Sequence, residues 1–308
     1  MKTYNNIKEY NKKKSVVTIG TFDGVHIGHK KILERIILNA KELNCESVVI
    51  TFFPHPRMVL QDNSVVQLLN TVDEKTILLE KTGIDNLIIH PFNQEFSRLT
   101  AEEFVKEILV NQLNIQKIII GYDHRFGRNR TANINDLIVF GEEYGFEVDQ
   151  ISAQEINDNA VSSTKIRNAI LEGKITLAND YLGYNYFFSG IIVKGKQLGR
   201  TIGFPTANIK INEDYKLIPK NGVYIVKSNY NKRIIYGMMN IGTRPTVDGQ
   251  NQTIEVNFFD FNEDIYDELI TIELLDFIRE EQKFDSFDSL KNQLYSDKET
   301  SLSFISRL

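Results

Sequence analysis

The sequence predicts an α/β domain with a parallel, doubly wound sheet, followed by a small antiparallel β-barrel with a C-terminal helix. In the first half, strand-like apolar runs alternate with helix-like segments, which implies crossovers between parallel strands. In the second half, strand-like runs follow one another and are separated only by turn residues. Because 308 residues exceed one ordinary core, we expect two domains, residues 1–183 and 184–308.

Five strand-like runs and the helical segments between them make up the first domain. The strands are expected at 15–20, 46–52, 84–90, 117–121 and 146–151. The helices are expected at 29–43, 72–82, 100–112 and 134–145. Thr100 and Glu103 are spaced as a capping box at the start of the third helix. Since ligands bind at the carboxyl ends of strands in such sheets, the residues after each run are the candidate site.

The second domain consists mainly of strands. The runs are expected at 187–195, 222–228, 233–242, 253–261 and 268–277. A final helix is expected at about 286–307, with Phe287, Leu290 and Leu294 on one face. Residues 173–186 are expected to link the two domains.

Composition excludes several classes of protein. With 36 Lys and Arg against 41 Asp and Glu, the net charge of −5 argues against general nucleic-acid binding. The single cysteine, Cys45, excludes an intrachain disulfide framework and a Cys-rich zinc site. No apolar stretch approaches 18 residues and the N-terminus has no signal-like apolar region, so we expect no membrane span and a cytoplasmic protein.

The run GTFDGVHIGHKK, residues 20–31, follows the first strand directly and has the strongest functional pattern. Gly20 and Gly24 let the backbone approach a ligand, and the start of the next helix favours phosphate. His26 and His29 are three residues apart, so both point the same way and can donate hydrogen bonds during phosphoryl or nucleotidyl transfer. The alternative is a tight strand-to-helix turn with satisfied histidines. The run is neither a Walker A loop nor a dinucleotide fingerprint.

Two further motifs follow other strands. TFFPHP at 51–56 holds His55 between two prolines, which fix a rigid, extended loop. GYDHRFGRNR at 121–130 combines Asp123 with three arginines and two glycines, which suits a nucleotide or another polyanion. A solvated basic turn has the same composition.

A fourth motif, SSTKIR at 162–167, opens the last helix of the first half. Lys165 and Arg167 lie in its first turn, where the helix dipole disfavours cations. Cations in this place indicate a nearby anion, and an ordinary surface helix is the alternative.

Together, and in this order, G-x-F-D-G-x-H-x-G-H, P-H-P, G-x-D-x-R-F-G and S-S-T-x-I-R resemble the nucleotidyltransferase module of the bacterial bifunctional riboflavin kinase/FAD synthetase family. The resemblance implies a Rossmann-like nucleotidyltransferase domain that transfers AMP from ATP to FMN, giving FAD and pyrophosphate. Because the attacking phosphate of FMN is mostly ionised at neutral pH, this step needs alignment and charge stabilisation and no general base.

The resemblance also implies roles for residues of the first half. Its catalytic residues would be His26, His29, Asp123 and Arg167. Those at ATP and its phosphates would be Gly20, Phe22, Asp23, Gly24, Gly121, Arg125, Gly127, Ser163 and Thr164. Pro54, His55 and Pro56 would line the flavin side. His124 departs from the family, which usually has phenylalanine there.

In the second half, the run VKGKQLGRTIGFPTANI at 193–209 has features of a phosphate site. Gly195 and Gly199 permit close backbone approach, and Lys196 and Arg200 offer cationic partners for phosphate. The oxygen donors suited to Mg²⁺ are Thr206 and Asn208. The run matches the riboflavin-kinase signature G-R-x-x-G-F-P-T-A-N, which implies that ATP phosphorylates riboflavin to FMN.

By strand alternation alone, Glu255 is a solvent-facing carboxylate between Thr253 and Asn257. The resemblance instead implies that Glu255 is the base for the riboflavin 5′-hydroxyl, which gains from a base when it attacks ATP. It also implies that Arg279 lies at the flavin, with Phe284 and Phe287 in the same segment. Since no histidine follows residue 124, a carboxylate is the expected base of this half.

Two other functions are alternatives. Residues 26–29 read HIGH, which with Lys165 also resembles the adenylation site of class I aminoacyl-tRNA synthetases. The barrel motifs then have no explanation, and no anticodon-binding extension is evident. A non-catalytic flavin- or nucleotide-binding regulator is the second alternative.

The partners expected from the family are riboflavin, FMN and ATP with Mg²⁺, without nucleic acid or membrane, and the oligomeric state stays open. The segment LGYNY at 182–186 replaces the family's usual Leu-Gly-Arg-Pro.

Overall fold

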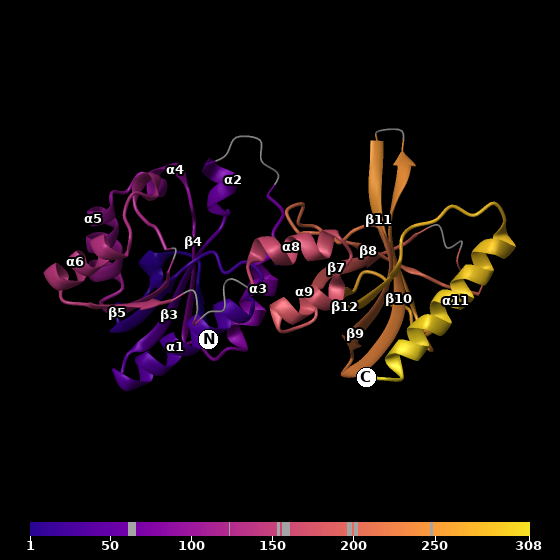
Figure 1. Ribbon diagram of the computed structural model, residues 1–308, viewed down its shortest axis with the longest axis horizontal. Helices are drawn as coiled ribbons and strands as arrows, with labels where there is room; N and C mark the ends of the chain where they lie inside the picture. The colour runs from indigo at the N-terminus through magenta and orange to yellow at the C-terminus, as the bar shows by residue number, and fades with distance from the viewer. Residues whose placement is uncertain are drawn as a thin grey trace. The chain divides into compact units, whose positions relative to one another are not determined.

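The computed structural model describes residues 1–60, 66–122, 124–152, 155, 161–195, 199, 203–246 and 249–308, with only the backbone for 244–246 and 249–251. Contacts between Cα atoms divide the chain into two compact units, Met1–Ser163 and Thr164–Leu308 (Figure 1). Each unit has one of the two predicted architectures.

The first unit contains a sheet whose neighbouring strands are all parallel. Its strands are β1 (Lys2–Tyr4), β2 (Ser15–Ile19), β3 (Glu46–Phe52), β4 (Asn86–His90), β5 (Ile115–Gly121) and β6 (Glu147–Ile151). They lie in the order β1-β4-β3-β2-β5-β6, which confirms the five predicted strands and adds β1 at the edge. The chain builds outward from β2 through β3 and β4, then resumes at β5 on the other side. The topological switch point therefore lies between β2 and β5, where such sheets bind ligands.

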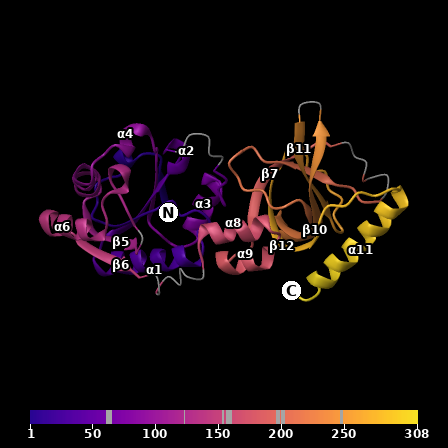
Figure 2. The ribbon, with the colours of Figure 1, turned by 45° about the horizontal axis from the view of Figure 1, so that its top comes forward.

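Helices cover both faces of this sheet (Figures 1 and 2). The longer ones are α1 (Ile27–Glu42), α3 (Val72–Glu80), η2 (Phe104–Gln112) and α6 (Ile134–Tyr144). The shorter ones are η1 (Ile7–Glu9), α2 (Pro56–Leu60), α4 (Gln94–Ser97), α5 (Ala101–Glu103) and η3 (Arg128–Arg130). Alternation along β2 explains the two layers, because Val17 belongs to a core with Val105 of η2, whereas Val16 packs with Ile36 of α1.

The helix predicted at 100–112 has an unexpected geometry. It begins with the predicted capping box, in which the Thr100 hydroxyl accepts the Glu103 N–H at 3.2 Å and the Glu103 carboxylate accepts the Thr100 N–H at 2.8 Å. From Phe104 to Gln112 the helix is π-helical, and the Leu113 N–H donates to the Ile108 carbonyl at 3.0 Å. Residue periodicity cannot distinguish this winding from an α-helix.

The second unit is a closed antiparallel barrel with the strand order β10-β11-β8-β7-β12-β9. Its strands are β7 (Phe187–Val193), β8 (Ala207–Lys210), β9 (Gly222–Tyr230), β10 (Arg233–Thr246), β11 (Gly249–Phe258) and β12 (Leu269–Arg279). Its helices are α8 (Ser163–Leu171), α9 (Ile175–Leu182) and α11 (Phe287–Ile305). The predicted barrel is confirmed. The short strand β8, which the sequence did not predict, pairs with β7 and β11.

The expected linker at 173–186 is largely helical. Its residues include α9, whose side chains Ile175, Ala178 and Leu182 are buried. The Asn179 amide donates to the Leu274 carbonyl of β12 at 2.9 Å and accepts the Tyr186 N–H at 2.7 Å. This segment is therefore packed onto the barrel.

An ion pair and an apolar cluster attach α11 to the barrel. The Arg279 guanidinium donates to the Asp297 carboxylate at 2.9 and 2.7 Å, and Asp297 is only 1% exposed. Leu294 packs against Phe204 and its neighbours, as predicted for that face of the helix. Phe287, which was expected on the same face, is instead 71% exposed, because it stands at the first residue of the helix.

Candidate functional sites

The loop from Gly20 to His26 connects β2 to α1 at the carboxyl edge of the sheet, beside the switch point. Phe22, Gly24 and Val25 have φ angles of 46°, 86° and 36°, so two residues with a Cβ adopt the left-handed region. Such a residue costs about 1–3 kcal/mol and persists only where its surroundings fix it. Phe22 and Val25 are both buried, and their packing holds the loop in this conformation.

The two histidines predicted to act together lie face to face. Their rings stack with centroids 3.6 Å apart, and the His26 Nδ1 accepts the His29 N–H at 3.4 Å as the N-cap of α1. A neutral His26 therefore carries its proton on Nε2. The Nδ1 of His29 is buried, and no hydrogen-bond partner for it is found among the described residues. Burial, and then the charges of His26 and Lys75, hold the pKa of His29 well below its usual value.

Asp23 joins segments that are distant in the sequence. It is 2% exposed, and its carboxylate accepts the Leu69 N–H at 2.9 Å. The Asp23 carbonyl accepts a hydrogen bond from the Ser163 hydroxyl at 2.9 Å. The structure thus brings Ser163, from the last motif of the first half, to Asp23 of the first motif. Thr164 and Arg167 follow Ser163 in α8.

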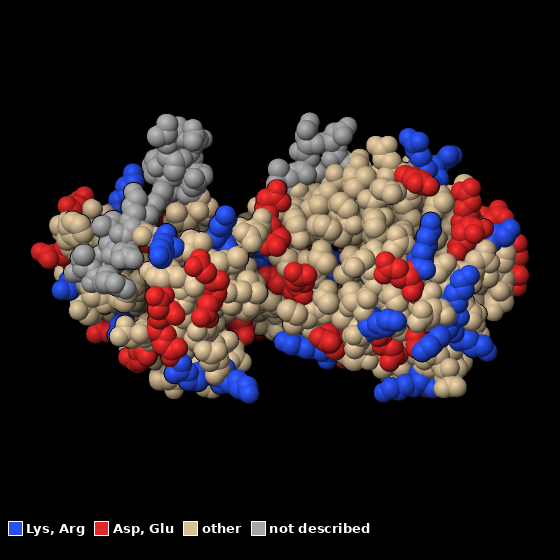
Figure 3. Space-filling model, turned by 180° about the vertical axis from the view of Figure 1, so that it is seen from behind, with Lys and Arg blue, Asp and Glu red and all other residues tan. Residues whose placement is uncertain are grey.

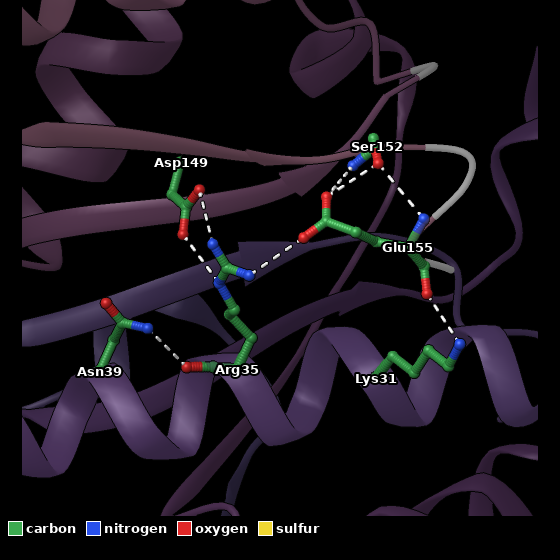
Figure 4. A network of polar contacts seen from close by, with 6 residues as sticks. All are labelled: Lys31, Arg35, Asn39, Asp149, Ser152 and Glu155. Carbon is green, nitrogen blue, oxygen red and sulfur yellow. Dashed lines mark hydrogen bonds and ion pairs between the residues drawn. The ribbon is translucent and has the colours of Figure 1, made fainter. Parts of the chain in front are cut away.

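An ion-pair network ties the segment after β6 to α1 (Figure 4). The Arg35 guanidinium donates to Asp149 at 3.1 Å and to Glu155 at 3.2 Å. Glu155 also accepts the Ser152 N–H at 2.8 Å, and the Lys31 ammonium donates to the Glu155 carbonyl at 2.7 Å. These contacts fix where the chain leaves the sheet, before the motif that contains Ser163.

The two prolines beside His55 occupy different kinds of backbone position. Pro54 follows a cis peptide bond after Phe53, and Pro56 is the first residue of α2, where a missing N–H is tolerated. His55 is buried, and its Nδ1 accepts the Arg57 N–H at 3.1 Å. The loop is therefore fixed at the carboxyl end of β3, which neighbours β2 in the sheet.

The loop after β5 begins at Gly121, and its Asp123 lies outside the described residues. The His124 ring stacks on Phe126 with centroids 6.1 Å apart, and burial lowers the pKa of His124 to about 4. The imidazole of His124 is therefore neutral at pH 7. Gly127 has a φ of 71°, and a Cβ there would lie 2.9 Å from the Ala101 nitrogen, so the close approach requires glycine. Arg125 is exposed.

The second unit brings several oxygen-bearing side chains together on β11, on β8 and on the residue just before β8. The Thr206 hydroxyl lies 3.4 Å from the Glu255 carboxylate, to which it donates. Asn208 of β8 is the register partner of Glu255 in β11 and of Val193 in β7. Glu255 is half-buried instead of fully solvent-facing, which departs from the strand pattern taken alone.

Glycines shape the turn beside these donors. A Cβ on Gly195 would lie 2.1 Å from the Asn208 amide nitrogen, so glycine is needed for the amide to fit. The Gly199 carbonyl accepts the Phe204 N–H at 2.9 Å, shortly before β8. Lys196 and Arg200, predicted as phosphate partners, lie outside the described residues.

Arg279, predicted at the flavin, has its guanidinium on Asp297 and 5.8 Å from the Phe284 ring. The structure also reveals a buried residue that the motifs do not contain, Lys75 of α3, directly below the Gly20–His26 loop. The sequence could have indicated Lys75 in one way: it stands at a position of the predicted helix 72–82 where the spacing of the other residues favours an apolar side chain.

Three histidines with lowered pKa values predict that stability falls at acidic pH. The pKa values of His29, His90 and His124 are all lowered, chiefly by burial, from about 6.5. The unfolded chain therefore binds more protons below pH 6.5, and the free energy of unfolding decreases as pH falls through that value. We expect the thermal midpoint to drop between pH 7.5 and 5, a range in which carboxylates stay ionised.

His124→Phe, which removes one of the three, should flatten this decrease. A thermal midpoint that stays constant over the range, or an unchanged slope in the variant, would contradict the assignment. Differential scanning calorimetry at fixed ionic strength provides the measurement.

The surface charge and the hydropathy of the helices match what the composition predicts. On the face in Figure 3, basic and acidic side chains are interspersed over both units. Within the described ranges, none of the helices combines the length and apolar character needed to cross a bilayer.

Comparisons with known proteins match both halves of the chain. A family model described as FAD synthetase matches residues 8–165, and one described as riboflavin kinase matches residues 182–305. Proteins named bifunctional riboflavin kinase/FMN adenylyltransferase are similar over nearly the whole chain. The one from Buchnera aphidicola subsp. Schizaphis graminum is 40% identical, covering 96% of this chain and 95% of its own. The one from Bacillus subtilis is 36% identical, covering 96% and 94%.

A solved structure has the same fold over the same extent. It is titled as a macrolide-efflux protein from Streptococcus pneumoniae, and it matches with a TM-score of 0.88 and 32% identity. The match covers 97% of each chain, so both units have counterparts in that one molecule.

Proposed function

The chain belongs to the bifunctional riboflavin kinase/FMN adenylyltransferase family, and from that premise we propose which residues perform each of its two reactions. The enzyme phosphorylates riboflavin with ATP to FMN, and then transfers AMP from a second ATP to FMN, giving FAD and pyrophosphate. We assign the second reaction to a domain of residues 1–183 and the first to residues 184–308, in line with the family matches at 8–165 and 182–305. The synthetase hypothesis leaves the barrel unexplained, and a non-catalytic regulator does not account for the matches to two enzyme families in the two halves, so neither is retained.

The adenylyl-transfer site is built around the start of α1. The observation that supports it is the buried His29 Nδ1, which no described residue satisfies, at a helix N-terminus beside the switch point. Triphosphate oxygens would satisfy it, while the His26 ring, whose Nδ1 accepts the His29 N–H, offers its Nε2–H as a second donor. Gly20, Phe22, Asp23 and Gly24 shape this loop, and the hydroxyl of Ser163 donates to the Asp23 carbonyl within it.

The loop after β5 supplies the other side of the same site. We assign nucleotide contacts to Gly121, Asp123, Arg125 and Gly127, and triphosphate contacts to Ser163, Thr164 and Arg167. Pro54, His55 and Pro56 would line the flavin side, at the end of the strand next to β2. Because the FMN phosphate is already an anion, these residues need only align it with the α-phosphorus and stabilise the developing charge.

The phosphoryl-transfer site is built around Glu255. A riboflavin 5′-hydroxyl must lose its proton as it attacks the γ-phosphorus, and we assign Glu255 as the carboxylate that accepts this proton. The Thr206 hydroxyl holds one oxygen of Glu255, which fixes the orientation of the carboxylate. Gly195, Lys196, Gly199 and Arg200 would approach the ATP phosphates, and Arg279 would approach the flavin.

The donors of this site fit Mg²⁺. Thr206, Asn208 and Glu255 provide a hydroxyl, an amide and a carboxylate on adjacent segments, and these hard oxygens are the type that Mg²⁺ prefers alongside substrate phosphates. We propose that Thr206 and Asn208 hold the ion. When bound, Mg²⁺ neutralises phosphate charge during phosphoryl transfer. A cytoplasmic location is proposed from the sequence.

Thr206→Val tests the metal assignment. The variant keeps the shape of the side chain but removes the hydroxyl, so riboflavin phosphorylation should need a several-fold higher Mg²⁺ concentration for half-maximal rate. Adenylylation of supplied FMN should keep its Mg²⁺ dependence. Both rates are followed chromatographically in Mg²⁺ titrations of the full chain.

Thr271→Val is the matched control, since Thr271 is an exposed threonine of β12 whose hydroxyl pairs with Ser189 at 2.8 Å. An unchanged Mg²⁺ requirement in Thr206→Val would remove Thr206 from the metal site. An equal shift in both reactions would place its effect outside the kinase site.

A further inference from the structure

Lys75 is a buried lysine that neither reaction has yet used. It lies on α3, among Leu78 and Leu79 on the helix face that packs inward, and it is only 5% exposed. Burying an ammonium group costs several kcal/mol of hydration, roughly, even after relaxation. A leucine or methionine would cover the same apolar surface without that cost. A lysine at this buried position is therefore best explained by a role for its positive charge or for its N–H donors.

The ammonium group of Lys75 is hydrogen-bonded to the loop that precedes α1. It donates to the Thr21 carbonyl at 2.8 Å and lies 3.4 Å from the Thr51 hydroxyl. The Thr51 hydroxyl donates to the same Thr21 carbonyl at 3.1 Å. Thr21 is the residue directly before Phe22, the first of the strained residues in the Gly20–His26 loop. One carbonyl at the root of this loop is thus held by donors from both α3 and β3.

The same charge acts on its neighbours in the site. Burial lowers the pKa of Lys75, and the nearby Asp23 carboxylate opposes that effect. In turn, the charge of Lys75 is one of the causes that lower the pKa of His29. Lys75 therefore lies close enough to interact electrostatically with both the Asp23 carboxylate and the His29 imidazole.

We propose that Lys75 is a positioning residue for FMN adenylylation, which holds the Gly20–His26 loop in the conformation that receives the ATP phosphates. This rests on the proposed adenylyl-transfer site. The strained backbone of Phe22 and Val25 relaxes unless its surroundings fix it, and the ammonium bond to the Thr21 carbonyl is one of the fixing contacts. The buried positive charge also favours a polyanion above the loop.

Lys75→Met on the full chain tests the proposal, since methionine matches the length of lysine and removes only the ammonium group. We expect kcat/KM for ATP in FMN adenylylation to fall about 10²-fold, the cost of misplacing a reacting group. Both a higher KM and a lower kcat should contribute, because the loop holds the triphosphate before and during the reaction. Riboflavin phosphorylation by the same preparation should be unchanged, and it shows that the second domain remains folded.

Lys75→Arg keeps a charged donor and should recover part of the lost activity, which a purely apolar packing role would not predict. Lys81→Met is the matched control, because Lys81 is an exposed lysine at the end of the same helix. It should leave both reactions unchanged. If Lys75→Met lowers the thermal midpoint so far that the first domain unfolds, Lys75→Gln, which keeps a neutral donor, replaces it.

The outcomes separate this inference from the site on which it rests. Full adenylylation by Lys75→Met, together with loss in His29→Ala, would overturn the role of Lys75 alone. Full adenylylation by both variants would overturn the adenylyl-transfer site itself. An equal loss of both reactions in Lys75→Met, or no recovery with arginine, would reduce Lys75 to a structural residue.

Discussion

Glu255→Gln is expected to abolish FMN formation while FMN adenylylation continues. The amide keeps the shape of the side chain and can still accept from the Thr206 hydroxyl, but it cannot take a proton from the riboflavin 5′-hydroxyl. General-base catalysis contributes typically about 10²–10⁴-fold, and the rate of riboflavin phosphorylation should fall by that factor. The measurement is chromatographic, with riboflavin or FMN supplied separately with ATP and Mg²⁺.

Glu273→Gln serves as the control for this variant. Glu273 is also a strand carboxylate of the barrel, but it pairs with Lys227 at 3.2 Å and with Asn185 at 2.9 Å. Both reactions should survive its replacement. Loss of both reactions in Glu255→Gln, or of neither, would contradict a separate phosphoryl-transfer site with Glu255 as its base.

His29→Ala is expected to have the opposite selectivity. Without the imidazole, the triphosphate loses a preorganised partner where charge develops, and the His26 ring loses the ring on which it stacks. Removal of one such partner typically costs about 10²–10³-fold, so FAD formation from FMN and ATP should fall by that amount. Riboflavin phosphorylation should be unaffected.

His90→Gln is the control, because His90 is a buried histidine of the same sheet that we assign to neither site. The His90 Nδ1 accepts the Ile7 N–H at 3.4 Å, and the glutamine carbonyl can take over that bond. Adenylylation should persist in this variant. If His29→Ala forms FAD at the wild-type rate, the assignment of the phosphate-facing histidines is wrong.

The two variants together test how the chain divides its chemistry. All five histidines lie at or before residue 124, yet the first reaction in the chemical order takes place in the half without histidine. In the proposed assignment, that half uses Glu255 as its base, whereas the half with the histidines works on a phosphate that is already ionised. The proposed sites would thus match the distribution of residue types to the proton requirement of each step.

Local patterns predicted most of the fold. Apolar runs and turn residues located five parallel strands and the barrel, because burial on a sheet and helix amphipathicity are properties of neighbouring residues. The same patterns missed β8, since Ala207–Lys210 is short and lies inside a turn-rich motif. They also took 173–186 for a linker, although α9 fills much of it, because its buried face is recognised only against β12.

For the candidate sites, the sequence by itself determined the family, the motifs and the types of chemical group, since motif order and residue identity are written along the chain. Only the tertiary structure decided which of them meet. It joined Asp23 to Ser163, placed the Thr206 hydroxyl on Glu255, bound Arg279 to Asp297 and put Lys75 under the Gly20–His26 loop. These contacts span distant positions and depend on sheet order and side-chain packing, which periodicity does not encode.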